Sequence, residues 1–520
     1  MASKKRASLL TKYKNLVDGI ETICFAGKVV RVTGQLIEAD GPQSVVGECC
    51  KIRLFDDRQI ACEVVGFNKD RVQLMAYDNI EGIEKGCEVI ATGSPLSVAV
   101  SHSLLGRVID SQGQPIDGKG PIGDGTFYSI FNRPPSVMSR QPITKRLFTG
   151  IRAVDFMTPV AKGQRMGIFS GSGVGKSTLI GMIARNTNAD INVIALIGER
   201  GREVLDMVRR DLGEEGLARS VVVVSTSDTP ALARVRGAYV AMAIAEYFRD
   251  QGKDVMMLFD SVTRLAMAQR EIGLAIGEPS ATKGYTPSVS VVLQKILERC
   301  GTAAIGSITG FFTVLVEADD MDDYVVDTVR GIIDGHIVLD RSLANSYHYP
   351  AIDVLASLSR LTSSVSTKEE QKGAGKLRQL LSLYKEKEDL INVGAYSPGS
   401  NFLLDEAVNK IGAINSFLQQ GEFEQEPYIV TLKKASYLVN QDYRPLAPLY
   451  GGDDYNEALW DEIEVGALAQ NLYQPQGVGM MQNSQLANNY QAAALASNQM
   501  SSDRARIQFQ PQSTLKRGRP

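Results

Sequence analysis

A short run near the middle of this 520-residue chain has the residue types and spacing needed to bind a phosphate chain. Residues 170–178, Ser-Gly-Ser-Gly-Val-Gly-Lys-Ser-Thr, separate an apolar run ending at Phe169 from a helix-like apolar run beginning at Leu179. Glycines let successive backbone N–H groups face phosphate oxygens, and the following helix presents its positive end to an anion. The strict pattern has glycine where Ser170 stands, but the order of strand, loop and helix is kept. The sequence therefore predicts a site for a nucleoside triphosphate.

Two side chains of this loop would act on the phosphates directly. Lys176 brings a mobile positive charge to the phosphate oxygens, and Ser177 offers its hydroxyl to Mg²⁺. The candidate nucleotide-binding residues are Gly171, Ser172, Gly173, Val174, Gly175, Lys176, Ser177 and Thr178.

A carboxylate that suits the same site follows an apolar run further along the chain. In an open α/β sheet, ligands bind beyond the carboxyl ends of the strands, so polar residues that follow apolar runs are candidates. The run 255–259 leads into Asp260, which is typical of a Walker B strand delivering a carboxylate to the Mg²⁺ shell. Asp260 comes 84 residues after Lys176, which leaves room for two intervening strand–helix units.

A second carboxylate follows the apolar run 193–197 and would face the same crevice. Glu199 is the candidate to polarise an attacking water. Taken alone, however, the hexapeptide 198–203 favours a salt bridge from Glu199 to Arg200 or Arg202 at the start of a helix. The residues themselves leave both interpretations open.

A third place of interest is the segment 349–360, which follows another strand-like run. It supplies an aromatic side chain, Tyr349, and a cation, Arg360. By composition alone, an arginine in such a position is most often a surface or structural residue.

These candidates need a mostly parallel sheet to bring them together, and strand-like and helix-like runs alternate along residues 98–366. Short β-rich runs split by Gly and Asp predict a small closed or sandwiched β domain over residues 26–97. Apolar residues at helical intervals predict a helical domain over residues 367–450. Strands of the central sheet are expected at Arg165–Phe169, Asn192–Ile197, Ser220–Ser225, Val255–Phe259 and Ala303–Thr309.

The two ends of the chain differ from the body in composition. Residues 1–25 combine basic side chains with apolar ones at helical spacing, which predicts an amphipathic helix that docks to a partner, to an anionic membrane or to its own protein. Residues 451–520 are rich in Gln, Asn, Ala and Ser, and are predicted to be a disordered tail. The tail would serve as a solubilising extension or carry weak self-association.

Composition excludes several classes of protein. A net charge of −3 and a pI near 5.9 argue against a general nucleic-acid binder, which usually carries a strong basic excess. The six cysteines include no C-x-x-C pair, so reduced thiols in a cytosolic protein are expected. The sequence has neither a transmembrane-length apolar stretch nor the apolar core of a secretory signal, so any membrane contact is expected to be peripheral.

Several stretches together resemble the rotary ATPase superfamily, which includes the catalytic subunit of ATP synthase. Within it the likeness is strongest to the flagellar and type III secretion export ATPases, and it covers roughly residues 26–420. The superfamily likeness rests on the phosphate-binding loop and on residues 105–110, 115–118, 149–155, 198–203 and 357–360, and the export-type likeness on 169–176, 306–317 and 334–341.

The resemblance implies a RecA-like P-loop core with an N-terminal β-barrel and a C-terminal helical domain. It implies that Lys176 and the loop amides hold the β and γ phosphates of ATP, while Ser177 ligates Mg²⁺ with support from Asp260. Glu199 would be the catalytic base, and Tyr349 would flank the adenine. Arg360 resembles an arginine finger that reaches into a neighbouring subunit's site.

The function implied is Mg²⁺-dependent ATP hydrolysis that energises protein export through the flagellar type III apparatus, at the cytoplasmic side of the inner membrane. A homohexamer is implied, with a stator-like regulator at the N-terminal helix. A central stalk and chaperone–substrate complexes would meet the C-terminal domain, and the ring would work at a membrane export gate. The alternatives are an injectisome ATPase, an ATP synthase-type subunit, a hexameric RNA translocase and a silent nucleotide-binding scaffold.

The chain departs from the family pattern in one further place. The family's acidic stretch with Asp-Pro is represented by residues 319–324, where Tyr324 takes the proline position. We expect catalysis to tolerate this change, which bears on local loop shape.

Overall fold

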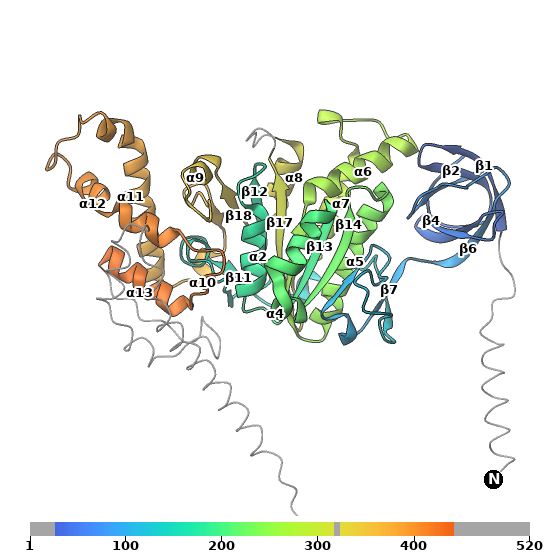
Figure 1. Ribbon diagram of the computed structural model, residues 1–520, viewed down its shortest axis with the longest axis horizontal. Helices are drawn as coiled ribbons and strands as arrows, with labels where there is room; N and C mark the ends of the chain where they lie inside the picture. The colour runs from blue at the N-terminus through green and yellow to red at the C-terminus, as the bar shows by residue number, and fades with distance from the viewer. Residues whose placement is uncertain (1–25, 317–322, 441–520) are drawn as a thin grey trace, which may run out of the picture. The chain divides into compact units, whose positions relative to one another are not determined.

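The computed structural model describes residues 26–316 and 323–440 (Figure 1). The predicted N-terminal helix over residues 1–25, the predicted tail over 451–520 and most of the acidic stretch 319–324 lie outside the described residues. Within the described part, no helix is both long enough and apolar enough to span a bilayer. The five cysteines in this part are all free thiols, as predicted.

The N-terminal β domain is a closed barrel with the strand order β1-β2-β5-β4-β3-β6. The strand pattern alone left a barrel and a sandwich open, and the structure confirms the barrel that the family resemblance implied. Its interior is filled by side chains such as Val29, Ile37, Ile52, Leu74 and Val89. The strands are β1 (Ala26–Thr33), β2 (Leu36–Asp40), β3 (Glu48–Arg53), β4 (Gln59–Asn68), β5 (Arg71–Ala76) and β6 (Glu88–Pro95).

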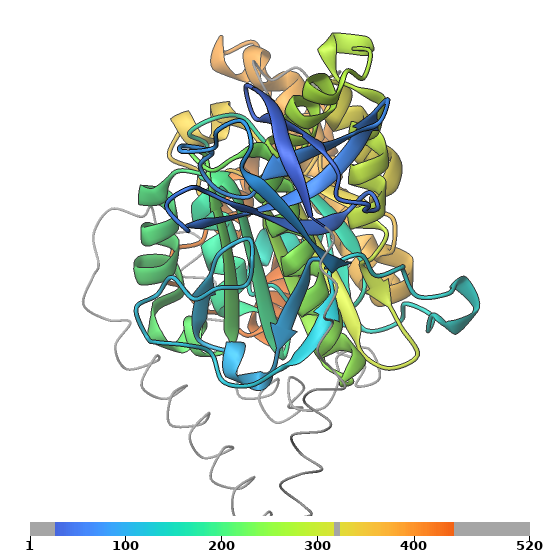
Figure 2. The same cartoon turned by 90° about the vertical axis from the view of Figure 1, so that its right-hand side faces the viewer.

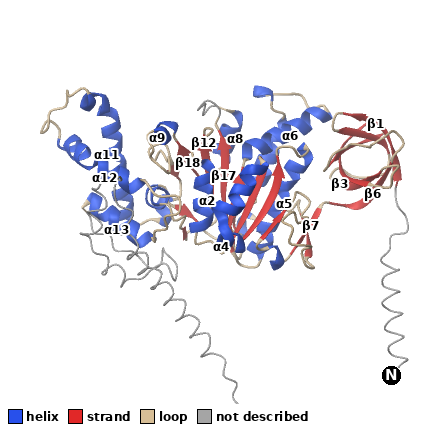
Figure 3. Ribbon diagram, viewed as in Figure 1, coloured by secondary structure: helices blue, strands red, loops and turns tan. Residues whose placement is uncertain are grey.

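The central domain is built on a sheet with the order β19-β18-β12-β17-β15-β13-β14-β8, in which β8 to β18 pair in parallel and β19 is antiparallel. Helices cover both faces of this sheet (Figures 2 and 3). Strands covered on both faces read as continuous apolar runs, and all of β13 is buried. The strands are β8 (Arg107–Ile109), β12 (Arg165–Ser170), β13 (Ile191–Glu199), β14 (Ser220–Thr226), β15 (Asp254–Asp260), β17 (Ser307–Leu315), β18 (Gly335–Leu339) and β19 (Leu358–Ser359).

Shorter strands and the covering helices complete the central domain. The short strands are β7 (Ser97–Val100), β9 (Thr126–Ser129), β10 (Arg146–Leu147), β11 (Val160–Ala161) and β16 (Gly301–Thr302). The helices are α2 (Lys176–Asn186), α3 (Gly201–Asp206), α4 (Gly213–Ala218), α5 (Ala231–Asp250), α6 (Val262–Ile276), α7 (Pro287–Leu297), α8 (Tyr324–Ile332), α9 (Arg341–Asn345) and α10 (Thr362–Val365).

One predicted strand was wrong in its position. The sequence placed a strand at Ala303–Thr309, but residues 303–306 form the turn between β16 and β17, and β17 begins at Ser307. Gly306 has φ +67°, and a Cβ on this residue would lie 2.3 Å from the carbonyl oxygen of Arg249. Only glycine fits this turn, and the apolar residues on both sides hid the break.

The C-terminal region is helical, as predicted, with α11 (Lys368–Asn392), α12 (Phe402–Leu418) and α13 (Tyr428–Val439). Thr367 and Glu370 form a capping box that begins α11, and Asn401 caps α12 through the backbone N–H groups of Leu403 and Leu404. The apolar residues that predicted these helices, such as Leu377 and Ile414, are buried between them.

Tyr324 occupies the first position of α8, directly after the capping residue Asp323. Proline is tolerated at the first helical position because its missing N–H would have no intrahelical partner there. Other residues fit this position as well, and Tyr324 begins the helix without a proline. The Tyr324 ring stacks on that of Tyr285 at a centroid distance of 5.2 Å.

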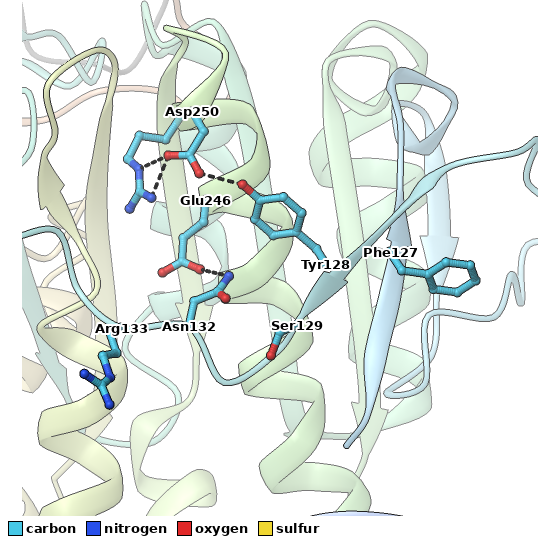
Figure 4. Close-up of a pocket in the computed structure, with 8 residues that line it drawn as sticks. Phe127, Tyr128, Ser129, Asn132, Arg133, Glu246 and Asp250 are labelled. Carbon is cyan, nitrogen blue, oxygen red and sulfur yellow. Dashed lines mark hydrogen bonds and ion pairs between the residues drawn. The ribbon is translucent and has the colours of Figure 1, made fainter. Parts of the chain in front are cut away.

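A buried ion pair joins α5 to the segment that follows α7. Glu246 accepts hydrogen bonds from Arg299 Nε at 2.8 Å and Nη2 at 2.6 Å, and both side chains are 1% exposed. Asn132 donates a further bond to Glu246 at 3.0 Å, at the edge of a polar cavity of about 420 Å³ (Figure 4). In the same cavity the Tyr128 hydroxyl donates to Asp250.

Replacing Arg299 by methionine is expected to lower the free energy of unfolding by about 3–5 kcal/mol, because Glu246 is left buried without its cation. A matched control is Arg53→Met, which breaks the Arg53–Glu88 pair, whose side chains are 45% and 43% exposed. That change is expected to cost about 0–1 kcal/mol. Urea unfolding of both variants measures the difference, and equal losses would contradict this role of the buried pair.

Candidate active site

The predicted phosphate-binding loop lies between β12 and α2, at the carboxyl edge of the sheet. Gly173 has φ +79° and Gly175 has φ +93°, conformations that side chains disfavour. No described atom lies within 4 Å of a Cβ built on Gly173, so the loop borders open space. The loop opens directly into α2, with Gly175 at the N-cap. Backbone N–H groups at such a helix start suit an anion.

The departure at Ser170 has a simple structural reason. Ser170 is the last residue of β12, pairs with Leu315 of β17 and Leu339 of β18, and is 1% exposed. It is extended like any strand residue and has no positive φ. Glycine is therefore not required at this position.

Lys176 begins α2 and points toward two carboxylates. Its Nζ lies 2.5 Å from Asp260 Oδ1 and 3.6 Å from Glu199 Oε1. Burial alone would lower the pKa of Lys176, but the charges of Asp260 and Glu199 outweigh burial and raise the pKa above its ordinary value. Lys176 is therefore held as a cation between the two residues that the sequence singled out on separate strands.

Glu199 ends β13 and is 5% exposed. Among the described residues its Oε1 has no hydrogen-bond partner. Burial and the nearby charge of Asp260 raise the pKa of Glu199 to about 7, against the opposing charge of Lys176. A carboxylate with a pKa near neutral pH suits a general base.

The alternative role for Glu199, a salt bridge to a neighbouring arginine, does not describe its contacts. The ion partner that the structure gives Glu199 is Lys176, and Arg202 pairs with Asp206 at 3.6 Å. Glu199 thus pairs with the lysine of the loop and not with a neighbouring arginine.

Asp260 is oriented by a residue that the sequence analysis missed. Thr313 Oγ1 donates to Asp260 Oδ1 at 2.7 Å from the adjacent strand β17. Thr313 is 1% exposed within an otherwise largely apolar strand, and that polar interruption was the signal that could have found it. Hydroxyl and carboxylate oxygens are ligands that suit Mg²⁺. Asp260, with Ser177 in the first turn of α2, therefore fits the expected metal.

Replacing Thr313 by valine is expected to raise the Mg²⁺ concentration that gives half-maximal ATP hydrolysis by about 10- to 100-fold, because Asp260 loses the bond that orients it. A matched control is Thr309→Val on the same strand, where Oγ1 accepts from the N–H of Gly163 far from Asp260. Titration of activity with Mg²⁺ measures both variants. Equal midpoints for Thr313→Val and wild type would contradict the positioning role.

A second missed residue is Arg264, one turn into α6 after Asp260. Its side chain packs against Gly198, where a built Cβ would lie 2.8 Å from Arg264 Cβ. In the described part of the chain, its buried Nε has no hydrogen-bond partner. A further cation therefore lies next to the strand end that carries Glu199.

Tyr349 lies beside the loop, although 173 residues separate it from Lys176 in the chain. Two of its ring carbons are 3.6 and 3.7 Å from a Cβ built on Gly175. The side chain is 42% exposed, and its backbone oxygen accepts from the N–H of Gln420 at 2.9 Å. An aromatic face held here is available to stack on a flat base.

Arg360 lies near the amino ends of the parallel strands, whereas the loop lies at their carboxyl ends. Its N–H bonds the carbonyl oxygen of Asp334, and the Asp334 carboxylate bonds Arg165 at the start of β12. The loop follows the end of this six-residue strand, about 17 Å away at roughly 3.3 Å per residue. Arg360 is exposed, and the described residues provide no ion partner for it. The structure therefore separates Arg360 from the other candidate residues of its own chain.

Known protein families match three successive parts of the chain. The ATP synthase alpha/beta family, beta-barrel domain, matches residues 29–93, and the nucleotide-binding domain of that family matches residues 150–359. The T3SS EscN ATPase C-terminal domain matches residues 366–434.

Individual relatives match over most of their length. The flagellum-specific ATP synthase of Treponema pallidum (strain Nichols) is 53% identical, with 83% of this chain and 97% of the relative covered. The type 3 secretion system ATPase of Xanthomonas euvesicatoria is 48% identical, with 78% and 92% covered. A solved structure of assembled EscN in complex with its central stalk EscO, from the enteropathogenic E. coli type III secretion system, is 40% identical. It has a TM-score of 0.74 and covers 79% of this chain and 100% of that chain.

Proposed function

The chain belongs to the family of flagellar and type III secretion export ATPases, and we propose that it hydrolyses MgATP to energise flagellar protein export. The observation that carries the enzymatic part is the cluster of Lys176, Glu199 and Asp260 beside an open phosphate-binding loop. The flagellar assignment is supported by 53% identity to a flagellum-specific relative, against 48% to the type 3 secretion relative named above.

In this proposal the residues of the chain divide the work of phosphoryl transfer. The loop amides and Lys176 bind the phosphates, and Tyr349 stacks on the adenine. Ser177 and Asp260 hold Mg²⁺, which when bound neutralises charge on the phosphates. Glu199 accepts a hydrogen bond from the attacking water and orients it. Its Oε1 accepts no hydrogen bond from the described residues and is the acceptor that this role needs.

Arg360 completes the site from a neighbouring copy. Its backbone is bonded to Asp334 beside the start of β12, whereas the loop follows the end of that strand. Its side chain is exposed, so a second copy can meet it. Because each chain carries both a Glu199 and an Arg360, identical subunits can complete every site. We therefore propose a homohexamer.

Partners and location follow the same proposal. EscN has been solved with a central stalk, and we assign a stalk and chaperone–substrate complexes to the C-terminal helices, with a stator-like regulator at residues 1–25. The ring would work in the cytoplasm at the membrane export gate, without nucleic acid. We also propose five parts of the chain: an N-terminal helix (1–25), a β-barrel domain (26–97), an ATPase domain (98–366), a helical domain (367–450) and a tail (451–520).

A second candidate function is the ATPase of an injectisome, supported by the similarity to the Xanthomonas protein and to EscN. Deletion of the gene, followed by complementation with wild type and Glu199→Gln, tests the choice. The flagellar proposal expects loss of filaments and motility, restored by wild type and not by the variant. Normal motility with loss of secretion into host cells would favour the injectisome instead.

A further inference from the structure

An apolar loop tip lies exposed between β9 and β10. Val137 is 82% exposed and Met138 is 93% exposed, and both belong to a short 3-10 turn, Val137–Ser139, within the connection formed by residues 130–145. This part of the chain, drawn in teal, projects from the central domain in Figure 2.

The loop is fixed to the sheet although its tip is exposed. Arg140 donates from Nη1 to the carbonyl oxygen of Cys300 at 3.0 Å and from Nη2 to that of Glu298 at 2.9 Å. Gln141 bonds the same segment through its backbone, where its N–H donates to the carbonyl oxygen of Ala303 and its carbonyl oxygen accepts from the Thr302 hydroxyl. A binding element held in place before contact loses little conformational entropy when it docks.

A glycine makes this anchoring fit. Gly301 has φ +129°, and a Cβ on it would lie 2.0 Å from Arg140 Nη1. The backbone therefore leaves room for the guanidinium only because position 301 has no side chain. The fixed geometry of the tip is built into the local sequence.

The same anchor continues to Arg360. Glu298, whose carbonyl oxygen holds Arg140, pairs through its carboxylate with Arg165 at 2.7 Å. Arg165 in turn pairs with Asp334 at 3.0 Å, and the Asp334 carbonyl oxygen accepts from the N–H of Arg360. The exposed tip and Arg360 are thus joined by one chain of hydrogen bonds and ion pairs at the end of the sheet where β12 begins.

We infer that Val137 and Met138 dock onto the next copy of the chain, on the face that carries its phosphate-binding loop, and so hold together the two copies that share the Arg360 site. The inference rests on the proposed homohexamer, because Arg360 at this end of the sheet reaches a site only in a second copy. A contact between two different faces of identical subunits repeats around a ring. The exposed apolar tip is the part of that face which association would remove from water.

The test is the double variant Val137→Asp with Met138→Asp, examined by mass photometry and ATPase assay over a range of protein concentrations with MgATP. The midpoint concentration of assembly is expected to rise at least about tenfold. Activity per assembled ring is expected to return to the wild-type value once rings form at high concentration, because the tip touches no reacting atom. Thermal unfolding measured below the assembly midpoint should be unchanged, since both side chains are exposed in the single chain.

A matched control is Val393→Asp, in the turn after α11, where the valine is 77% exposed. This variant should assemble like wild type. An unchanged assembly midpoint in the double variant, or an equal shift in Val393→Asp, would overturn the docking inference. Either result leaves the proposed function standing if Arg360→Ala still assembles without hydrolysing ATP. By contrast, a wild-type rate independent of concentration and untouched by Arg360→Ala would remove the proposed ring itself.

Discussion

Replacement of Arg360 by alanine is expected to lower kcat by about 10³- to 10⁵-fold while assembly and ATP binding persist. The guanidinium would stabilise charge that develops on the phosphates during transfer, and it would do so in a neighbouring copy. Its side chain is exposed, so the substitution should not disturb folding. Steady-state ATPase rates, measured where mass photometry shows complete rings, give the effect.

The control for this experiment is Arg330→Ala, another exposed arginine, located in α8. Its loss should leave kcat within about threefold of wild type, the scatter expected of a surface change. A full rate in assembled Arg360→Ala rings would show that the finger assignment is wrong. A failure to assemble would instead give Arg360 a role in the interface.

The second large effect is expected from Glu199→Gln, which should lower kcat by about 10²- to 10⁴-fold. Glutamine keeps the shape of the side chain but cannot take a proton, so the attacking water loses its base. Nucleotide affinity should remain, because Lys176 and the loop are untouched. Single-turnover hydrolysis together with calorimetric binding of ATP separates the two quantities.

Glu203→Gln is the matched control, because Glu203 on α3 bonds the Glu199 side chain and helps to raise its pKa, whereas the ion partners of Lys176 are Glu199 and Asp260. We expect less than about a tenfold change in kcat. If Glu203→Gln were as inactive as Glu199→Gln, the base would have to be reassigned between them.

Much of the fold could be read from the sequence, because parallel strands covered on both faces are continuous apolar runs. The strands ending at Ser170, Glu199 and Asp260 were located in this way, and their polar ends fell together at one edge. The strand before Thr309 was misplaced, since apolar residues flank the turn at Gly306 and periodicity cannot distinguish turn from strand there.

The site was harder to predict where its parts act through tertiary contacts. Thr313 and Arg264 reach the cluster across neighbouring elements. The polar interruption of β17 marks Thr313 as unusual, but it does not identify Asp260 as its partner, and no local pattern marks Arg264. Arg360 shows the converse problem, since the sequence grouped it with Tyr349. The antiparallel strand β19 returns the chain to the amino ends of the parallel strands. This strand has only two residues, so the sequence pattern did not predict the reversal.

The measurement that tests the shared site most directly is the ATPase activity of mixed rings made from Glu199→Gln and Arg360→Ala subunits. Each variant alone is expected to be inactive. In a one-to-one mixture that exchanges subunits, about a quarter of the sites should pair an intact Glu199 with an intact Arg360 and recover activity. Mixed rings that form but stay inactive would contradict a site completed by the neighbouring copy.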